Sequence, residues 1–330
     1  MISEQKSKKV VVLGTGGTIA GRASCASDNI GYTAAQVGVA DLLASVPGLD
    51  AVLAGHRLHS EQVAQVDSKD MGFALWQALA SRISDHLAQP DVTGVVITHG
   101  TDTLEETAYF LHAVLPLALQ NSKPVVLTCA MRPATALSPD GPQNLLDAVV
   151  VALTPGAQGV VAVCAGVVHS ALDVQKNHTY RLDAFGSGDA GVLGYVEEAQ
   201  LRFIRNWPLA LTQYALPAIK IDLSSGHWPR VEVVLSHAGC SGAVVDALLL
   251  PCADRAPLRG IVAAGSGNGS LHQDLECALQ RAVQAGIRVV RATRCAQGRV
   301  LPVSNSAFAD SKGLSPVKAR IALMLELMAA

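Results

Sequence analysis

The chain lacks the features that would assign it at once to nucleic-acid-binding or membrane proteins. Its 330 residues carry 25 Lys and Arg against 27 Asp and Glu, so no basic surface for nucleic acid or an anionic membrane is expected. No apolar run approaches the ~20 residues that a membrane-spanning helix needs. The apolar run after the three N-terminal lysines ends at Gly14 and is too short for a signal peptide. The sequence therefore predicts a cytoplasmic protein with no nucleic-acid and no membrane partner.

Cysteine and histidine lack the spacings of metal and redox motifs. The seven cysteines are an odd number and include no C-x-x-C pair, and the ten histidines show no H-x-x-x-H pattern. We therefore predict no metal and no cofactor. Cys129 and Cys164 fall in apolar, strand-like runs, where a buried free thiol is expected.

Aromatic residues are also scarce, at 4%, whereas half of the chain is hydrophobic and rich in Val, Ala and Leu. This composition is typical of a buried parallel sheet covered by helices, and the length indicates about two domains. We predict an α/β protein with two α/β domains. The larger N-terminal catalytic domain, residues 1–203, has a mostly parallel sheet flanked by helices, and a linker over 204–228 leads to a smaller flavodoxin-like domain over 229–330.

Hydrophobic periodicity and turn residues place the elements within these domains. Strands are expected over residues 10–14, 94–98, 124–129, 159–165, 231–235, 260–264 and 287–291. Helices are expected over residues 34–46, 71–89, 104–119, 241–250, 271–285 and 316–328, with a further helix opened by Asp140. Ser68 or Asp70 is the expected cap of the helix over 71–89, and Asp102 and Glu105 have capping-box spacing.

Two predicted strands end in unusual groups of glycine, hydroxyl and carboxylate residues. The strand over 10–14 runs into Gly14-Thr15-Gly16-Gly17, and the strand over 94–98 runs into His99-Gly100-Thr101-Asp102-Thr103. A dinucleotide motif would need a glycine at Ile19 and a helix at once, but a loop of turn formers follows. Because α/β proteins bind ligands at the carboxyl ends of strands, both groups predict a site at one sheet edge. The loop over 21–31 is interpreted as a mobile flap.

The chemistry of these residues favours a hydrolase. A threonine hydroxyl is a weak nucleophile and needs a base or a proton-accepting network. A second threonine and a lysine held by a carboxylate form such a network, as in Ser–Lys variants of the catalytic triad. Lys176 lies in an alternating, partly polar segment. Burial beside a hydroxyl lowers the pKa of a lysine, so that its neutral amine is available as a base.

Longer stretches resemble the bacterial L-asparaginase family. Leu13–Gly21 and Ile97–Thr107 resemble both signatures of that family, and Cys129–Pro133, Ser138–Asn144 and Asp173–Lys176 look like it in the same order. The resemblance implies hydrolysis of the side-chain amide of L-asparagine to L-aspartate and ammonia without a cofactor. It also implies a homo-oligomer, either a dimer or a tetramer, and the two-domain α/β fold.

Matched residue by residue, the resemblance assigns five catalytic residues. Thr15 resembles the nucleophile that attacks the amide carbon, and Tyr32 resembles the flap tyrosine that orients it. Thr101 and Lys176 resemble the second hydroxyl and its base, held by Asp102.

The same comparison assigns the contacts of the substrate's backbone groups. Asp102 is expected to bind the α-ammonium group and Ser68 the α-carboxylate, with Gly100 and Thr101 beside them. Lys69 stands where many relatives carry glutamine, and its cation is expected either to pair with the α-carboxylate or to alter the selectivity against L-glutamine.

Two alternatives stay open at this point. A dual glutaminase-asparaginase uses the same motifs on a substrate one methylene longer. A non-catalytic amino-acid sensor is possible on a doubly wound fold, because a fold does not determine a function.

Overall fold

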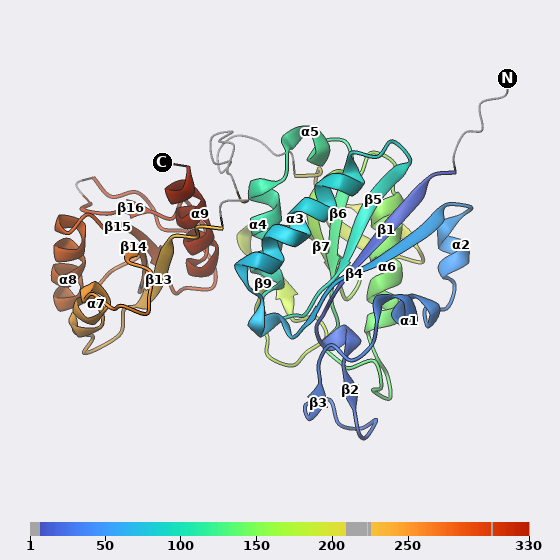
Figure 1. Cartoon of the computed structure of the whole chain (residues 1–330), viewed down its shortest axis with the longest axis horizontal. Helices are drawn as coiled ribbons and strands as arrows, with labels where there is room; N and C mark the ends of the chain where they lie inside the picture. The colour runs from blue at the N-terminus through green and yellow to red at the C-terminus, as the bar shows by residue number, and fades with distance from the viewer. Residues whose placement is uncertain (1–6, 209–222, 224–225, 305, 330) are drawn as a thin grey trace. The chain divides into compact units, whose positions relative to one another are not determined.

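A computed structural model describes residues 7–208, 223, 226–304 and 306–329 (Figure 1). The chain forms two compact units that divide near residue 211, and each is described by itself. Each unit has a sheet flanked by helices, the first being larger and mostly parallel, so the predicted fold class is confirmed. The predicted linker over 204–228 falls mostly outside the described residues, and the predicted domain boundaries stay a prediction.

The described residues of the first unit form an eight-stranded sheet in the order β12-β11-β8-β7-β6-β5-β1-β4. Strands β4, β1, β5, β6 and β7 run parallel, and β8, β11 and β12 continue the sheet antiparallel. The strand bounds are β1 Lys9–Gly16, β4 Arg57–Val66, β5 Val92–Thr98, β6 Pro124–Thr128, β7 Gly159–Cys164, β8 Val167–Ser170, β11 Gly194–Glu197 and β12 Gln200–Phe203.

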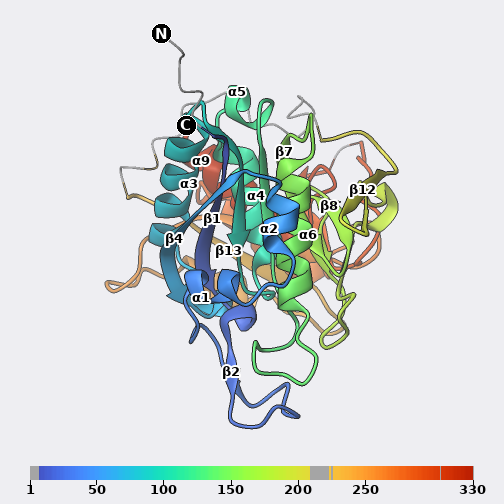
Figure 2. The ribbon, with the colours of Figure 1, turned by 90° about the vertical axis from the view of Figure 1, so that its right-hand side faces the viewer.

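Helices cover both faces of this sheet, as Figure 2 shows for α3 and α6. Alternate residues of β1 face opposite ways, so Val10 and Val12 join the core that contains α6. On the other face α3 packs on α4, where the rings of Trp76 and Phe110 stack with centroids 4.8 Å apart. The helix bounds are α1 Val39–Ala44, α2 Leu49–Leu53, α3 Phe73–Leu87, α4 Leu104–Val114, α5 Leu117–Gln120 and α6 Gly141–Leu153.

The strand order reverses beside β1. From β1 the chain crosses to β4 at the sheet edge, and then returns to β5 on the other side of β1. Open α/β sheets bind ligands at such a switch point, outside the carboxyl ends of the two strands, and this region is called the crevice below. The threonine groups that follow β1 and β5 therefore lie at this crevice.

Two short hairpins lie near the carboxyl edge of the sheet. Strand β2 (Arg22–Ala23) pairs with β3 (Tyr32–Thr33), and this hairpin projects from the lower end of the first unit in Figure 1. Strand β9 (Gln175–Lys176) pairs with β10 (Phe185–Gly186), with Lys176 opposite Phe185. The second hairpin carries the lysine that the sequence pattern selects.

The second unit is a smaller parallel sheet in sequential order, β13-β14-β15-β16. Helices α7 and α8 contribute to the core on one face, and α9 packs on β13, β14 and β15. The bounds are β13 Arg230–Leu235, α7 Ala243–Leu249, β14 Leu258–Gly265, α8 Gln273–Gln284, β15 Arg288–Thr293, β16 Ala309–Asp310 and α9 Pro316–Met328. No described helix is both long and apolar enough to cross a membrane.

The secondary structure differs from the sequence prediction at several places, and the short elements α2, β8, β11 and β12 are not predicted. Strand β4 is not predicted, because it is an edge strand whose residues are nearly all exposed or half-buried. The helix predicted over 34–46 begins only at Val39. The helix predicted over 104–119 ends at Val114 because Pro116 interrupts it, and the short helix α5 follows.

Both capping predictions are wrong. Helix α3 begins after Gly72, with no side-chain cap, so neither Ser68 nor Asp70 caps it. Helix α4 begins after Thr103, also without a side-chain cap. Asp102 and Glu105 instead make their bonds to Lys176, which leaves them as parts of the crevice rather than of the helix end.

The buried free thiols are confirmed. Cys129 and Cys164 follow or end neighbouring strands, both are buried and free, and their sulfur atoms lie 3.2 Å apart. Burial and the mutual hydrogen bond raise the pKa of the Cys129 thiol far above its ordinary value, so it stays protonated.

Candidate active site

Three loops at the switch point lie in close contact, two of them through backbone atoms. Gly17 has a φ of +81°, and a Cβ built on it would lie 2.3 Å from the Cα of Gly100. A Cβ on Gly100 would lie 2.5 Å from Oγ of Ser68. Only glycine permits these approaches, because any side chain would push the loops apart. The loops after β1, β4 and β5 are thus held at van der Waals contact.

Thr15 lies at the end of β1 and is buried, with 3% of its surface exposed. Its Oγ1 donates a hydrogen bond of 2.9 Å to the carbonyl oxygen of Thr98 on β5. This bond fixes the side-chain rotamer and occupies the hydroxyl hydrogen. The lone pairs of Oγ1 stay available to an electrophile.

Thr101, Asp102 and Lys176 form a compact polar group. The Lys176 ammonium donates to Thr101 Oγ1 at 2.8 Å and to Asp102 Oδ1 at 2.6 Å. Lys176 is mostly buried, with 18% of its side chain exposed, whereas 54% of the Asp102 side chain is exposed. The amide of Lys176 also donates to Glu105 Oε1 at 3.2 Å, which anchors β9 to the first turn of α4. The structure therefore brings together three residues that lie up to 75 positions apart.

Ser68 joins this group from the loop after β4. Its Oγ accepts a hydrogen bond from the amide of Asp102 at 3.2 Å, and its carbonyl accepts one from the Thr103 hydroxyl at 2.8 Å. Ser68 is 2% exposed. Oγ accepts this bond with a lone pair, so the hydrogen of the Ser68 hydroxyl is available to an acceptor on a bound substrate.

Tyr32 lies on the β2–β3 hairpin, and its hydroxyl bonds to Thr18 instead of Thr15. Its hydroxyl is 2.7 Å from Thr18 Oγ1, and among the described residues it has no hydrogen bond to Thr15. Burial raises the pKa of Tyr32 above its ordinary value, and the nearby charges of Asp67 and Asp102 add to this effect. The phenol is therefore neutral and faces the acidic side of the crevice.

The side chain of Lys69 pairs with a residue of its own loop. Its ammonium pairs with the carboxylate of Asp70, and 60% of its side chain is exposed. The hydrogen bond to Asp70 raises the pKa of Lys69 above its ordinary value. Its charge is thus present at the rim, beside Ser68, without a contact to Thr101 or Lys176 among the described residues.

His99 anchors the loop of Gly100 through a directed chain of hydrogen bonds that sequence reasoning does not identify. The Trp76 indole N–H donates to Thr107 Oγ1 at 2.9 Å, so the Thr107 hydroxyl hydrogen is left for His99 Nε2 at 3.0 Å. His99 Nδ1 then donates to the Gly100 carbonyl at 2.7 Å, because that oxygen only accepts. His99 is therefore a positioning residue for Gly100, and its only sequence signal is its place between β5 and the glycine.

Asn144 is a second residue whose role sequence reasoning misses. Its amide nitrogen donates to the Cys129 carbonyl at 2.9 Å, and its amide oxygen accepts from the Ala165 amide at 2.9 Å. The side chain is buried and ties the ends of β6 and β7 together. Such a role depends on the strand pairing, so no local pattern announces it.

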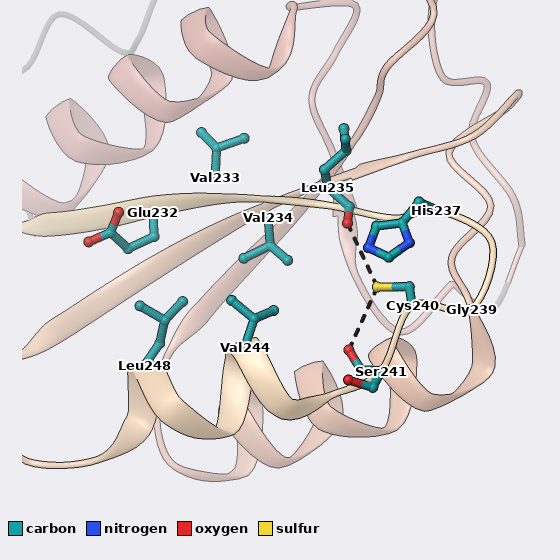
Figure 3. A pocket seen from close by; sticks show the side chains of 10 residues that line it. All are labelled: Glu232, Val233, Val234, Leu235, His237, Gly239, Cys240, Ser241, Val244 and Leu248. Carbon is teal, nitrogen blue, oxygen red and sulfur yellow. Dashed lines mark hydrogen bonds between the residues drawn. The ribbon is translucent and has the colours of Figure 1, made fainter.

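The second unit contains a hollow of about 490 Å³ between β13 and α7 (Figure 3). Val233, Val234, Val244 and Leu248 line it, and the Cys240 thiol beside it donates to the carbonyls of neighbouring residues. Its lining is mainly aliphatic and contains none of the predicted site residues. The crevice of the first unit is therefore the better candidate for polar chemistry.

The family of the chain follows from comparisons with known proteins. The family model described as "Asparaginase, N-terminal" matches residues 9–209, and "Glutaminase/Asparaginase C-terminal domain" matches residues 230–329. The chain therefore belongs to the asparaginase family.

Similar relatives cover nearly the whole chain. L-asparaginase 2 of Bacillus subtilis is 38% identical over 98% of this chain and 84% of that protein. L-asparaginase 2 of Escherichia coli is 36% identical over 96% of this chain and 88% of that protein. Glutaminase-asparaginase of Pseudomonas fluorescens is 34% identical over 98% and 88%. A probable cytoplasmic L-asparaginase from Campylobacter jejuni has a similar structure, with a TM-score of 0.87, 34% identity, and coverage of 98% of this chain and 96% of that one. The protein is thus an asparaginase enzyme.

The buried position of His99 predicts a pH-dependent contribution to stability. Burial lowers the pKa of His99 from 6.5 to about 4, against a smaller opposite effect of its bond to Gly100. Between pH 6.5 and pH 4 the unfolded chain binds a proton at this site that the folded chain does not. The free energy of unfolding should therefore fall with decreasing pH in this window, by up to about 3 kcal/mol from His99.

Urea unfolding of the wild type and of His99→Gln at pH 7, 6, 5 and 4 measures this contribution. Subtracting the two pH profiles cancels the other titrating groups. We expect the wild type to lose more stability on acidification than His99→Gln. Parallel profiles would contradict a neutral, buried His99.

Proposed function

We propose that the enzyme hydrolyses the side-chain amide of L-asparagine to L-aspartate and ammonia, with Thr15 as the nucleophile. The observation that carries the proposal is the position of the buried Thr15 hydroxyl and of the Thr101–Asp102–Lys176 group at the ends of the neighbouring strands β1 and β5. The asparaginase names of the similar relatives support this substrate.

The reaction proceeds in two steps. Thr15 Oγ1 attacks the amide carbon, the C–N bond breaks, and ammonia leaves with the hydrogen of the hydroxyl, so that an aspartyl ester forms on Thr15. Water then attacks the ester and restores the Thr15 hydroxyl. The Thr98 carbonyl that holds the hydroxyl hydrogen in the resting enzyme is too weak a base to remove it, so a separate proton path is needed.

Thr101 and Lys176 supply that path in our proposal. In the resting enzyme the Lys176 ammonium donates across this 2.8 Å contact; once Nζ has given up a proton, it accepts the Thr101 hydroxyl hydrogen, and Thr101 in turn takes one from the attacking hydroxyl or water. Asp102 Oδ1, 2.6 Å from Nζ, stabilises the lysine when it becomes protonated. Glu105 fixes the backbone of Lys176 and is therefore a positioning residue.

The remaining polar groups suit the zwitterionic end of the substrate. The exposed carboxylate of Asp102 binds the α-ammonium group, and the Ser68 hydroxyl donates to the α-carboxylate. Gly100 provides close access for the substrate, since a side chain there would collide with Ser68. Tyr32 closes over the bound substrate with the flap and orients Thr15 once the substrate is present.

A dual glutaminase-asparaginase is the second candidate, because a protein of that name covers nearly the whole chain at 34% identity. One methylene changes binding by only ~1–3 kcal/mol, or about 10- to 200-fold. We expect kcat/KM for L-asparagine to exceed that for L-glutamine by at least about tenfold. A homo-oligomer and a cytoplasmic location complete the proposal.

Removing the reacting groups should abolish turnover. We expect Thr15→Val, Thr101→Val and Lys176→Met each to lower kcat for ammonia release by about a thousandfold or more, because such groups act as a unit. Thr15→Ser keeps a hydroxyl and is the matched control that should retain measurable activity. Ammonia release from both L-asparagine and L-glutamine is the measurement. Full activity in Thr15→Val would rule out the proposed nucleophile.

Lys69 should affect substrate binding rather than chemistry. An exposed ion pair contributes about 0.2–1 kcal/mol, so Lys69→Gln should raise KM for L-asparagine by about 1.4- to fivefold with kcat unchanged. Asp70→Asn is the control that removes the resting partner of Lys69 but keeps its charge. An unchanged KM in Lys69→Gln would remove Lys69 from the substrate contacts.

A further inference from the structure

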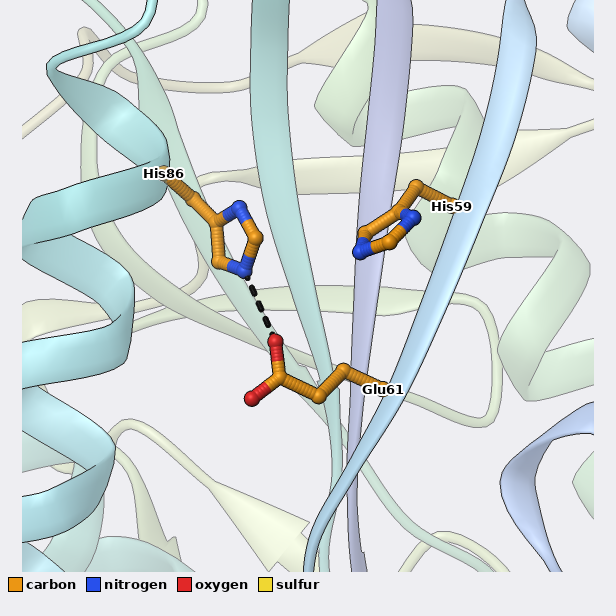
Figure 4. Close-up of side chains that lie close together, drawn as sticks. All are labelled: His59, Glu61 and His86. Carbon is orange, nitrogen blue, oxygen red and sulfur yellow. Dashed lines mark hydrogen bonds and ion pairs between the residues drawn. The ribbon is translucent and has the colours of Figure 1, made fainter.

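Three side chains able to bind a metal meet at the edge strand of the first sheet. His59 and Glu61 are two residues apart on β4 and therefore point to the same face, and His86 lies in the last turn of α3, which packs on β4. Their ligand atoms all lie within 4.8 Å of one another. Figure 4 shows the three side chains converging between the strand and the helix.

This cluster is distinct from the catalytic group. Glu61 pairs with Leu13 on β1, before the strand end that carries Thr15. The carboxylate of Glu61 bonds to Arg82 and His86, and the His59 ring lies 5.6 Å from the His86 ring. The proposed reaction uses none of these residues.

The three ligands suit a divalent cation, such as Zn²⁺, that is intermediate between hard and soft metal ions. Two imidazoles and one carboxylate, with a water in the fourth position, is a common set for Zn²⁺. Neighbouring ligand atoms in a tetrahedral zinc site lie about 3.3 Å apart, so the cluster has to contract by roughly 1.5 Å. His59 is exposed and can turn about its side-chain torsions to do this. Glu61 and His86 are already within 3.0 Å of each other.

Arg82 orients the carboxylate from behind. Its Nε donates to Oε1 and its Nη2 to Oε2 of Glu61, each at 2.7 Å. These two parallel hydrogen bonds fix the plane of the carboxylate. A carboxylate has about four lone-pair sites, so Oε2 keeps one for a metal while Arg82 stays bound.

His86 completes the arrangement. Its Nε2 lies 3.0 Å from Glu61 Oε2, where a metal ion would replace the shared hydrogen. Its Nδ1 is buried and has no hydrogen-bond partner within the described part of the chain.

We propose that His59, Glu61 and His86 bind one divalent transition-metal ion of the zinc class. The ion would join the edge strand β4 to α3. Since the site lies outside the catalytic group, the ion stabilises the fold and does not enter the reaction.

Zinc binding to the full-length chain tests the proposal directly. Protein treated with EDTA and freed of chelator is titrated with ZnCl₂ by calorimetry, and Co²⁺ serves as a spectroscopic probe. We expect one zinc ion per chain at this site, and a Co²⁺ visible spectrum of the intense, four-coordinate type. His59→Gln and Glu61→Gln should each weaken this binding by at least about tenfold.

Two controls separate a built site from adventitious binding. His237→Gln removes an exposed histidine of the second unit and should leave both readouts unchanged. Zinc should raise the thermal midpoint of the wild type and of His237→Gln but not that of His59→Gln, whose metal-free midpoint should match the wild type. Equal zinc affinity in the wild type and His59→Gln, or a Co²⁺ spectrum of the weak six-coordinate type, would overturn the proposal.

Discussion

The contact between the backbones of Gly17 and Gly100 is the constraint on which the crevice depends. It places the loop after β1 against the loop after β5, and Gly100 in turn leaves no room for a side chain beside Ser68. Three loops from neighbouring strands thus meet at atomic contact, which only glycine allows. Thr15, Thr101 and Ser68 then lie on three loops at the switch point of the sheet.

Polar residues after the strands serve this crevice instead of the helix ends. Asp102 and Glu105 have the spacing of a capping box, yet both bond to Lys176. The first turns of α3 and α4 accordingly lack side-chain caps. His99 holds Gly100 in place, because its neutral ring links Gly100 by hydrogen bonds to Thr107 and, through Thr107, to Trp76 in the core. The starts of α3 and α4 therefore lack the stabilisation of a side-chain cap, while Asp102 and Glu105 bond to Lys176.

Local sequence patterns predict part of the fold correctly. Apolar runs identify β1 and β5, and the helix predicted over 316–328 has the bounds of α9. The same patterns are insufficient where tertiary packing decides the structure. Edge strand β4 has no apolar run, and Pro116 ends α4 early.

The candidate site divides in the same way. The glycine and threonine residues at two strand ends are a local pattern, and they are sufficient to select Thr15 and Thr101. The links of His99 to Thr107 and of Asn144 to the ends of β6 and β7 depend on packing, so no spacing reveals them. His59 and His86 are separated in sequence by the rest of β4, the loop after it and nearly all of α3. Only the packing of α3 on β4 brings them together.

The most direct test of the central constraint is the kcat/KM of Gly17→Ala for L-asparagine beside that of Gly72→Ala. Gly72 has open space around its Cβ and an ordinary φ, so Gly72→Ala should keep the wild-type rate. Gly17→Ala has to move the loop of Gly100, and a displacement of ~1 Å in a catalytic site costs about a hundredfold. We therefore expect a loss of about a hundredfold or more in a folded Gly17→Ala protein. Wild-type activity in Gly17→Ala would contradict the account.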